Sequence, residues 1–114
     1  MKIAKSMAMS KSAVTVAGAK DVEIRWLISK DDGAPNFEMR MFELKPGGHT
    51  PLHRHSNEHE VFILEGQGTL VYEGKEYPFE KEYAIFVPCG KEHQFKNAGK
   101  STLRFLCLIP ATLG

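Results

Sequence analysis

Long hydrophobic runs, an excess of charge of one sign and a cysteine framework are all missing from this chain of 114 residues. No stretch approaches the roughly 18 consecutive apolar residues of a membrane span. The N-terminal stretch MKIAKSMAMSKS lacks the apolar centre of a secretory signal peptide. We therefore expect no membrane partner and a cytoplasmic location.

Charge and cysteine content exclude two further classes of protein. The 15 Lys and Arg residues nearly balance the 14 Asp and Glu residues, for a net charge of +1. The charges are mixed and no nucleic-acid recognition motif accompanies them, so we expect no nucleic-acid partner. Cys89 and Cys107 are far apart and form no C-x-x-C motif, which argues against a disulfide scaffold and fits a reducing compartment.

Helical periodicity is also scarce, and short apolar stretches alternate with turn signals instead. We predict strands at 13–17, 22–29, 37–44, 59–65, 69–73, 76–80, 83–87, 93–97 and 102–109. Gly74-Lys75 is interpreted as a two-residue hairpin turn. Many strands without a crossover helix favour an all-β fold, an antiparallel sandwich or barrel.

The length predicts one domain over residues 1–114, with 1–20 as an N-terminal extension or strand and 21–110 as a barrel. The strands at 61–64 and 103–109 are apolar on both sides, although a strand in a two-layer domain normally has one wet face. A homodimer, in which residues 1–20 can be exchanged between the two chains, would cover the outer apolar face of these strands. The alternative is an N-terminal segment that folds back over the same face within one chain.

Four of the five histidines fall between residues 49 and 59. His53 and His55 are two residues apart, so their rings point to the same side of an extended chain. His59 begins the next apolar run, and His93 begins a later strand that a barrel can bring close. Neutral imidazole binds manganese, iron, nickel, copper and zinc, so these four residues predict a site for one divalent transition metal per chain. A surface or core position is the alternative, and His49 is interpreted as a loop residue.

The residues around the first three of these histidines resemble a known motif. Gly47 is followed by five residues and then by His53-x-His55, with His59 and Gly66 further on. This spacing is similar to the first motif of the cupin superfamily, G-x5-H-x-H-x3–4-E-x6-G. The departure is that His59 stands at the glutamate position when the spacing to Gly66 is kept.

A second stretch carries the same resemblance. Pro88-x-Gly90-x2-His93-x3-Asn97 is similar to the second cupin motif, except that Glu82 stands where a glycine usually leads. The stretches 34–48 and 105–110 also resemble a small, single-domain, four-histidine cupin subgroup of thermophilic bacteria. The resemblance implies a double-stranded β-helix, or jelly-roll, barrel, and it favours manganese as the metal.

The identity of the ligand at the glutamate position depends on strand phase. His59 and Glu60 point to opposite sides of a strand, so only one of them can face a metal held by His53 and His55. We prefer His59. Four neutral imidazoles leave the full charge on a divalent ion, which favours acidic bound water and anionic ligands but weakens the preference for manganese. Glu58 and Glu60 are then expected to be solvated.

Strand parity also supplies candidate pocket residues. Phe95 shares the parity of His93, and Arg104 marks the wet face of the last strand, so Phe105, Cys107 and Ile109 should face inward. Cys107 is interpreted as a small buried apolar side chain, because nothing near it in the sequence would lower its pKa.

Stretch 37–44 is apolar on both faces, and two alternatives stay open. In the odd alternative, the odd-numbered side chains face inward, so Phe37, Met39 and Met41 are buried. In the even alternative, the even-numbered side chains face inward, so Phe42 and Leu44 are buried and Arg40 lies at the cavity mouth as an anchor for an anion.

A mostly apolar pocket with a metal and no obvious acid or base suits a non-haem, metal-dependent oxygenase that acts on a small organic molecule. The alternatives are a non-enzymatic module that binds a small ligand or metal, or an oxalate-decarboxylase-like or isomerase cupin. Fold alone does not decide between them.

Overall fold

The computed structural model describes residues 1–54 and 56–111, and within them the chain forms nine strands and two 3-10 turns. The 3-10 turns are η1 (Ser6–Ala8) and η2 (Lys30–Asp32). The strands are β1 (Lys11–Ala13), β2 (Lys20–Ile28), β3 (Phe37–His49), β4 (His59–Glu65), β5 (Gln67–Tyr72), β6 (Lys75–Glu80), β7 (Ala84–Val87), β8 (His93–Lys96) and β9 (Leu103–Pro110). The predicted all-β class is confirmed.

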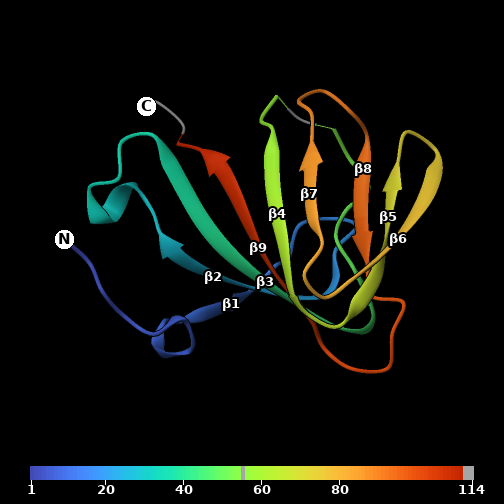
Figure 1. Cartoon of the computed structure of the whole chain (residues 1–114), viewed down its shortest axis with the longest axis horizontal. Helices are drawn as coiled ribbons and strands as arrows, with labels where there is room; N and C mark the ends of the chain where they lie inside the picture. Colours follow the sequence, from blue (N-terminus) through green and yellow to red (C-terminus); the bar gives the residue numbers. More distant parts are fainter. Residues whose placement is uncertain (55, 112–114) are drawn as a thin grey trace.

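The strands form one curled antiparallel sheet with the order β6-β5-β8-β3-β9-β4-β7, and β2 and β1 extend it from β3. Figure 1 shows the curled sheet, with β2, β3 and β9 on one side of the view and β4, β7, β8, β5 and β6 on the other. Strand β3 joins the two halves: residues 37–44 pair with β9, and His49 pairs with Lys96 of β8. This is the jelly-roll barrel expected from the sequence.

Strand β3 is five residues longer than predicted, because the Lys-Pro-Gly-Gly stretch does not end it. A Cβ atom on Gly48 would lie only 2.8 Å from the carbonyl oxygen of Lys20. The missing side chain therefore lets β2 and β3 stay in contact while β3 bends from one half of the barrel to the other. His49 is the last residue of this strand and not a loop residue.

Alternation along β4 and β9 builds the core, because every second side chain points into the barrel. On β9, Leu103, Phe105 and Cys107 are almost fully buried, and Ile109 packs partly against the same cluster. On β4, the alternate residues Val61 and Ile63 are buried as well. The predicted inward face of the last strand is confirmed.

Neither alternative for stretch 37–44 is correct by itself. Leu44 is buried in the core and Phe42 packs against it, as the even alternative requires. Met41 is also buried, with 1% of its surface exposed, whereas Phe37 is 71% exposed. Met41 pairs in register with Arg25 on the outer face, so both faces of β3 are covered near the middle of the strand.

The N-terminal extension covers part of that outer face within its own chain. Arg25 Nη1 donates a hydrogen bond to the carbonyl oxygen of Met9 at 2.7 Å. Lys2 Nζ donates to the carbonyl oxygen of Leu27 at 2.8 Å. The predicted strand at 13–17 is wrong in its bounds: β1 covers Lys11–Ala13, and beyond it the N–H of Val14 still donates to the carbonyl oxygen of Val22 in β2 at 2.9 Å.

The hairpin between β5 and β6 turns one residue earlier than predicted. Tyr72 pairs with Lys75, so the turn residues are Glu73 and Gly74, with φ angles of 47° and 80°. Two positive φ angles define the turn whose twist matches that of the flanking strands. The prediction of Gly74-Lys75 is wrong because the backbone of Glu73 adopts a left-handed conformation, which glycine adopts more readily than glutamate.

Glu82 occupies a strained backbone position, with φ of 76°. Its N–H donates to the carbonyl oxygen of Ile63 at 2.8 Å, which holds the turn before β7 in place. A non-glycine residue in this conformation costs about 1 kcal/mol. This strain explains why a glycine usually leads the second motif.

We predict that Glu82→Gly raises the free energy of unfolding by about 0.5–1 kcal/mol. The exposed Glu80, at the end of β6, gives a matched control. Glu80→Gly should lower the free energy of unfolding by a similar amount, because it adds backbone entropy to an ordinary strand position. Urea denaturation measures both, and a loss of stability in Glu82→Gly would contradict the prediction.

A charge network ties β2, β3 and β9 together on the outer face. Glu43 Oε1 accepts from Arg25 Nε at 3.1 Å, and Glu43 Oε2 accepts from Arg104 Nη2 at 3.1 Å. Arg104 Nη1 also donates to Glu65 at 2.6 Å. Burial by itself would raise the pKa of Glu43, but the hydrogen bonds from Arg104 and Arg25 outweigh it and hold the pKa below the usual value.

We predict that Glu43→Gln lowers the free energy of unfolding at pH 7 by about 2 kcal/mol. Because the pKa of Glu43 is lower in the folded state, its stabilisation is present above the unfolded-state pKa and disappears as the pH falls through the folded-state pKa. The difference between the two proteins should therefore vanish in acid. Denaturation at a series of pH values from 7 downward measures it, with Glu76→Gln, at an exposed ion pair, as the control. A difference that does not depend on pH would contradict the prediction.

Candidate metal-binding pocket

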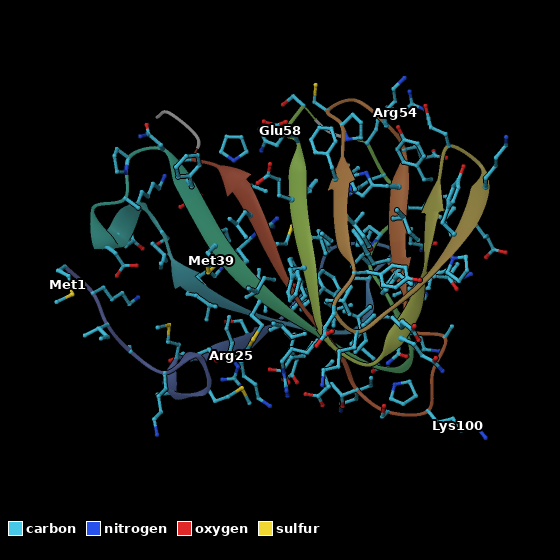
Figure 2. All side chains as sticks on the ribbon, viewed as in Figure 1. Met1, Arg25, Met39, Arg54, Glu58 and Lys100 are labelled. Carbon is cyan, nitrogen blue, oxygen red and sulfur yellow. The ribbon has the colours of Figure 1, made fainter. Side chains whose placement is uncertain are left out.

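A cavity of about 310 Å³ lies inside the barrel, and its walls carry three of the chain's histidines. His53, His59 and His93 share it with the apolar side chains of Phe42, Phe95 and Phe105. Arg54 and Glu58, which belong to the loop between β3 and β4, are at one end of the barrel, and Lys100 is at the opposite end (Figure 2). The histidine-rich loop therefore sits at one end of the barrel interior.

His53 and His93 face each other across a local backbone bridge. The N–H of His93 donates to the carbonyl oxygen of His53 at 2.9 Å, and the N–H of His53 donates to that of His93 at 3.2 Å. Their ring centroids are 5.4 Å apart. The turn after Pro88 thus delivers His93 to the loop that carries His53, although 40 positions separate them in sequence.

His59 approaches the same point from β4. Its ring centroid is 5.1 Å from that of His93, and 8% of the residue's surface is exposed. Glu60, its neighbour, is exposed on the other side of the strand. The structure therefore separates the two candidates for the glutamate position as strand phase requires, while ligation by His59 stays a prediction.

The described residues do not complete a metal site. His55, the remaining member of the predicted set, lies outside them. Among residues 1–54 and 56–111, no group of three or more His, Cys, Asp or Glu side chains is placed to hold a metal ion.

Ring spacing and proton position nevertheless fit a metal. A ligating ring nitrogen about 2.1 Å from an ion puts two such rings roughly 4.5–5.5 Å apart between centres. The His53–His93 and His59–His93 separations fall in this range. His93 Nδ1 lies 2.8 Å from the carbonyl oxygen of Lys91. A carbonyl only accepts, so Nδ1 carries the proton and Nε2 is the nitrogen suited to ligation.

His53 sits at the rim of the pocket. Partial burial, and to a smaller extent the neighbouring His93, lower the pKa of His53. A lowered pKa keeps the imidazole neutral, and the neutral form is the one that binds a metal.

Arg40 reaches into the pocket from β3, as the even alternative predicted. Its guanidinium carbon lies 5.6 Å from the ring centroid of Trp26 and 5.0 Å from that of Phe42. Its Nε atom is buried and has no hydrogen-bond partner within the described chain. A planar cation held between two aromatic rings is a suitable anchor for an anionic group.

Sequence reasoning missed three residues in or beside the site. Trp26 does not line the pocket, but its ring lies beside the guanidinium of Arg40. It shares the parity of Val22 and Ile24 on the neighbouring strand, and this parity could have indicated it. Val14 and Val16 line the pocket, but the sequence did not indicate which distant side chains they would meet there.

Cys107 is buried as predicted, but its surroundings differ from the expectation. Arg40 Nη2 donates to its Sγ at 3.0 Å, and His59 Nδ1 lies 3.0 Å from the same atom. The expectation that nothing nearby would lower its pKa is therefore wrong. Burial still raises the pKa of the Cys107 thiol, against the opposing effect of Arg40.

Two polar residues near the motifs have structural roles. Asn97, at the end of the second motif, is buried and donates to the carbonyl oxygens of Leu44 and Ser101 at 2.9 Å each. His49 lies outside the pocket walls, where its Nδ1 is 3.3 Å from Nε2 of Gln94.

Comparison with known proteins identifies the family that this barrel and its histidine-lined pocket define. The family model of the cupin domain matches residues 40–109. The chain belongs to the cupin domain family.

Individual relatives cover most of the chain. An oxalate-binding protein from Thermotoga maritima is 34% identical over 96 residues, which is 81% of this chain and 78% of that protein. The polyketide cyclase RemF from Streptomyces resistomycificus superposes with a TM-score of 0.92 and 37% identity, covering 98% of this chain and 80% of its own. A predicted oxalate decarboxylase from Thermotoga maritima gives a TM-score of 0.86 and 26% identity over 97% of this chain.

In the part of the chain that the structure describes, no helix has the length and apolar character needed to cross a membrane.

Proposed function

We propose that this cupin binds one divalent transition-metal ion through His53, His55, His59 and His93 and acts on a small organic anion in the adjoining pocket. The observation that carries the proposal is the convergence of His53 and His59 on His93, whose Nδ1 is held by a carbonyl oxygen. Manganese is the metal favoured by the sequence resemblance, and iron, nickel, copper and zinc suit imidazole as well.

The chain's own residues would bind and orient the substrate. A bound metal would polarise an oxygen atom of the substrate or of water. Arg40 would hold an anionic group beside it, since its guanidinium reaches the pocket and lies 3.3 Å from His59 Nδ1. Phe42, Phe95 and Phe105 would exclude water and pack against the apolar part of the substrate.

The first candidate reaction is oxygenation. Neutral imidazoles around the metal and an apolar pocket suit the use of dioxygen. We expect the protein to consume oxygen when it holds a redox-active metal and is given a small aromatic or aliphatic acid.

The second candidate is redox-neutral chemistry, and the comparisons favour it. The match to the polyketide cyclase spans 98% of this chain at 37% identity, which supports a cyclisation of a polyketide-like substrate. The likeness to an oxalate-binding protein supports a third version, in which the chain binds a small dicarboxylate without turnover.

One series of measurements tests all three. The metal content of protein purified without added metal comes first, followed by oxygen uptake and product analysis with aromatic acids and with oxalate. Oxygen uptake that depends on the metal supports oxygenation, and turnover without uptake supports the redox-neutral version. Binding without turnover supports the third version. Protein that takes up no metal under any loading condition refutes the common proposal.

A homodimer is the assembly we propose. Phe62 and Phe86 lie on the outer face of β4 and β7 and are 42% and 58% exposed. Burying such a face favours association by about 25 cal/mol per Å² before the costs of binding. Analytical ultracentrifugation should report a dimer that Phe86→Ser weakens, and a monomer at high micromolar concentration would refute it.

A further inference from the structure

The three side chains at the inner end of Arg40 form a closed triangle of polar contacts. Cys107 Sγ is 3.0 Å from Arg40 Nη2 and 3.0 Å from His59 Nδ1. Arg40 Nη2 and His59 Nδ1 are 3.3 Å apart. The residues come from the adjacent strands β3, β9 and β4, and Cys107 is 2% exposed. The sulfur therefore lies between a cation and an imidazole in a water-poor part of the pocket.

From this triangle we infer that Cys107 is a positioning residue, which fixes His59 for metal binding by accepting a hydrogen bond from its Nδ1. The inference rests on the proposed function, because it concerns a ring that would ligate through Nε2. It assigns Cys107 a role other than ligand, nucleophile or simple core residue.

The proton arrangement follows from what each group can do. An imidazole that ligates through Nε2 in its neutral form must carry its proton on Nδ1 and needs an acceptor there. The guanidinium of Arg40 has only donors and cannot serve. Cys107 Sγ can accept from both neighbours, so it separates two donors that would otherwise face each other at 3.3 Å.

The same geometry predicts what happens without the sulfur. A side chain with no acceptor at position 107 would leave the Nδ1–H of a ligating His59 directed at the Arg40 cation. The ring can avoid this conflict by accepting from Arg40 at Nδ1, but its proton then sits on Nε2 and blocks ligation. Metal affinity should fall although no proposed ligand has been removed.

Four variants separate this role from packing. Cys107→Val keeps the approximate volume and removes the acceptor, whereas Cys107→Ser keeps an acceptor. Arg40→Met combined with Cys107→Val removes the opposing donor. Cys89→Val alters the other cysteine, which is exposed, and serves as the matched control.

Zinc affinity, measured by competition with a chelator at pH 7.5, is the main measurement. We expect Cys107→Val to weaken zinc binding about 10- to 100-fold, as outer-shell partners of ligating histidines do. Cys107→Ser and Cys89→Val should bind like the wild type. Adding Arg40→Met to Cys107→Val should restore part of the loss, which a purely structural effect of Cys107 would not predict.

A spectroscopic measurement accompanies the affinities. In the zinc-loaded wild type, NMR should show a slowly exchanging Nδ1–H proton on His59, and this proton should exchange faster in Cys107→Val. Circular dichroism in excess chelator checks that each variant is folded. If Cys107→Val does not fold, the smaller Cys107→Ala replaces it in every comparison.

The possible outcomes separate the role of Cys107 from the existence of the metal site. Wild-type affinity in both Cys107→Val and Cys107→Ala overturns the inference and leaves the proposed function standing. A loss in Cys107→Ser as large as that in Cys107→Val also overturns it, because an acceptor would then be irrelevant. A wild type that binds no zinc removes the metal site itself, and the inference with it.

Discussion

His93→Ala is expected to weaken metal binding by more than about 100-fold, the upper end of the loss for residues that only support a ligand. The reason is the central position of His93, whose ring is within 5.4 Å of both described partner rings. Its backbone bridge to His53 uses main-chain atoms, so the substitution should leave the loop in place. Zinc affinity by chelator competition measures the effect.

His49→Ala is the matched control for this prediction. His49 is a half-buried histidine at the end of β3, whose Nδ1 lies close to the carbonyl oxygen of Thr50 and to Nε2 of Gln94 and whose ring does not line the pocket. We expect it to bind zinc as the wild type does. Equal losses in both variants would show that removing any histidine disturbs the fold, and no loss in His93→Ala would refute the proposed ligand set.

Phe105→Ala is expected to lower the free energy of unfolding by about 3–5 kcal/mol, the usual range for a fully buried Phe. Phe105 is 1% exposed. Its ring centroid is 5.4 Å from that of Phe42 and 4.9 Å from that of Phe95. These contacts join β9 to both β3 and β8, so the cavity left by alanine cannot close without moving both halves of the barrel.

Urea denaturation in excess chelator measures this loss without a contribution from bound metal. Phe37→Ala is the control, because Phe37 is 71% exposed and a surface substitution usually changes stability by less than about 0.5 kcal/mol. A loss below about 1 kcal/mol in Phe105→Ala would mean that the neighbouring side chains move in and fill the cavity left by the missing ring. The aromatic wall of the pocket would then be less rigid than the packing indicates.

Several local errors in the sequence-based predictions have one physical origin. The hairpin turn at Glu73 and the continuation of β3 through Gly48 depend on backbone conformations that the surrounding sheet imposes. Residue preferences for such conformations are weak, because tertiary contacts can offset about 1 kcal/mol of strain. Sequence reasoning therefore placed the hairpin turn one residue too late, at Gly74-Lys75, and ended β3 too early.

In the candidate site, some features could be predicted from the sequence and others could not. The parity of β8 and β9 predicted that Phe95, Phe105 and Cys107 face inward, and they do. The triangle that joins Arg40, His59 and Cys107 was not predictable, because it depends on the register of β3 and β4 against β9. A shift of one residue in either pairing would point these side chains to the other face.

By itself the sequence determined the all-β class, the cupin resemblance and the inward faces of the last two strands. Alternation and motif spacing are local properties, which a one-dimensional pattern records. Only the tertiary structure decided that both faces of β3 are covered near its middle, that Val14 and Val16 of the N-terminal extension line the pocket, and that Arg40 contacts Cys107. Those features depend on which distant segments pack together, and the free energy that selects them comes from burial summed over the whole barrel.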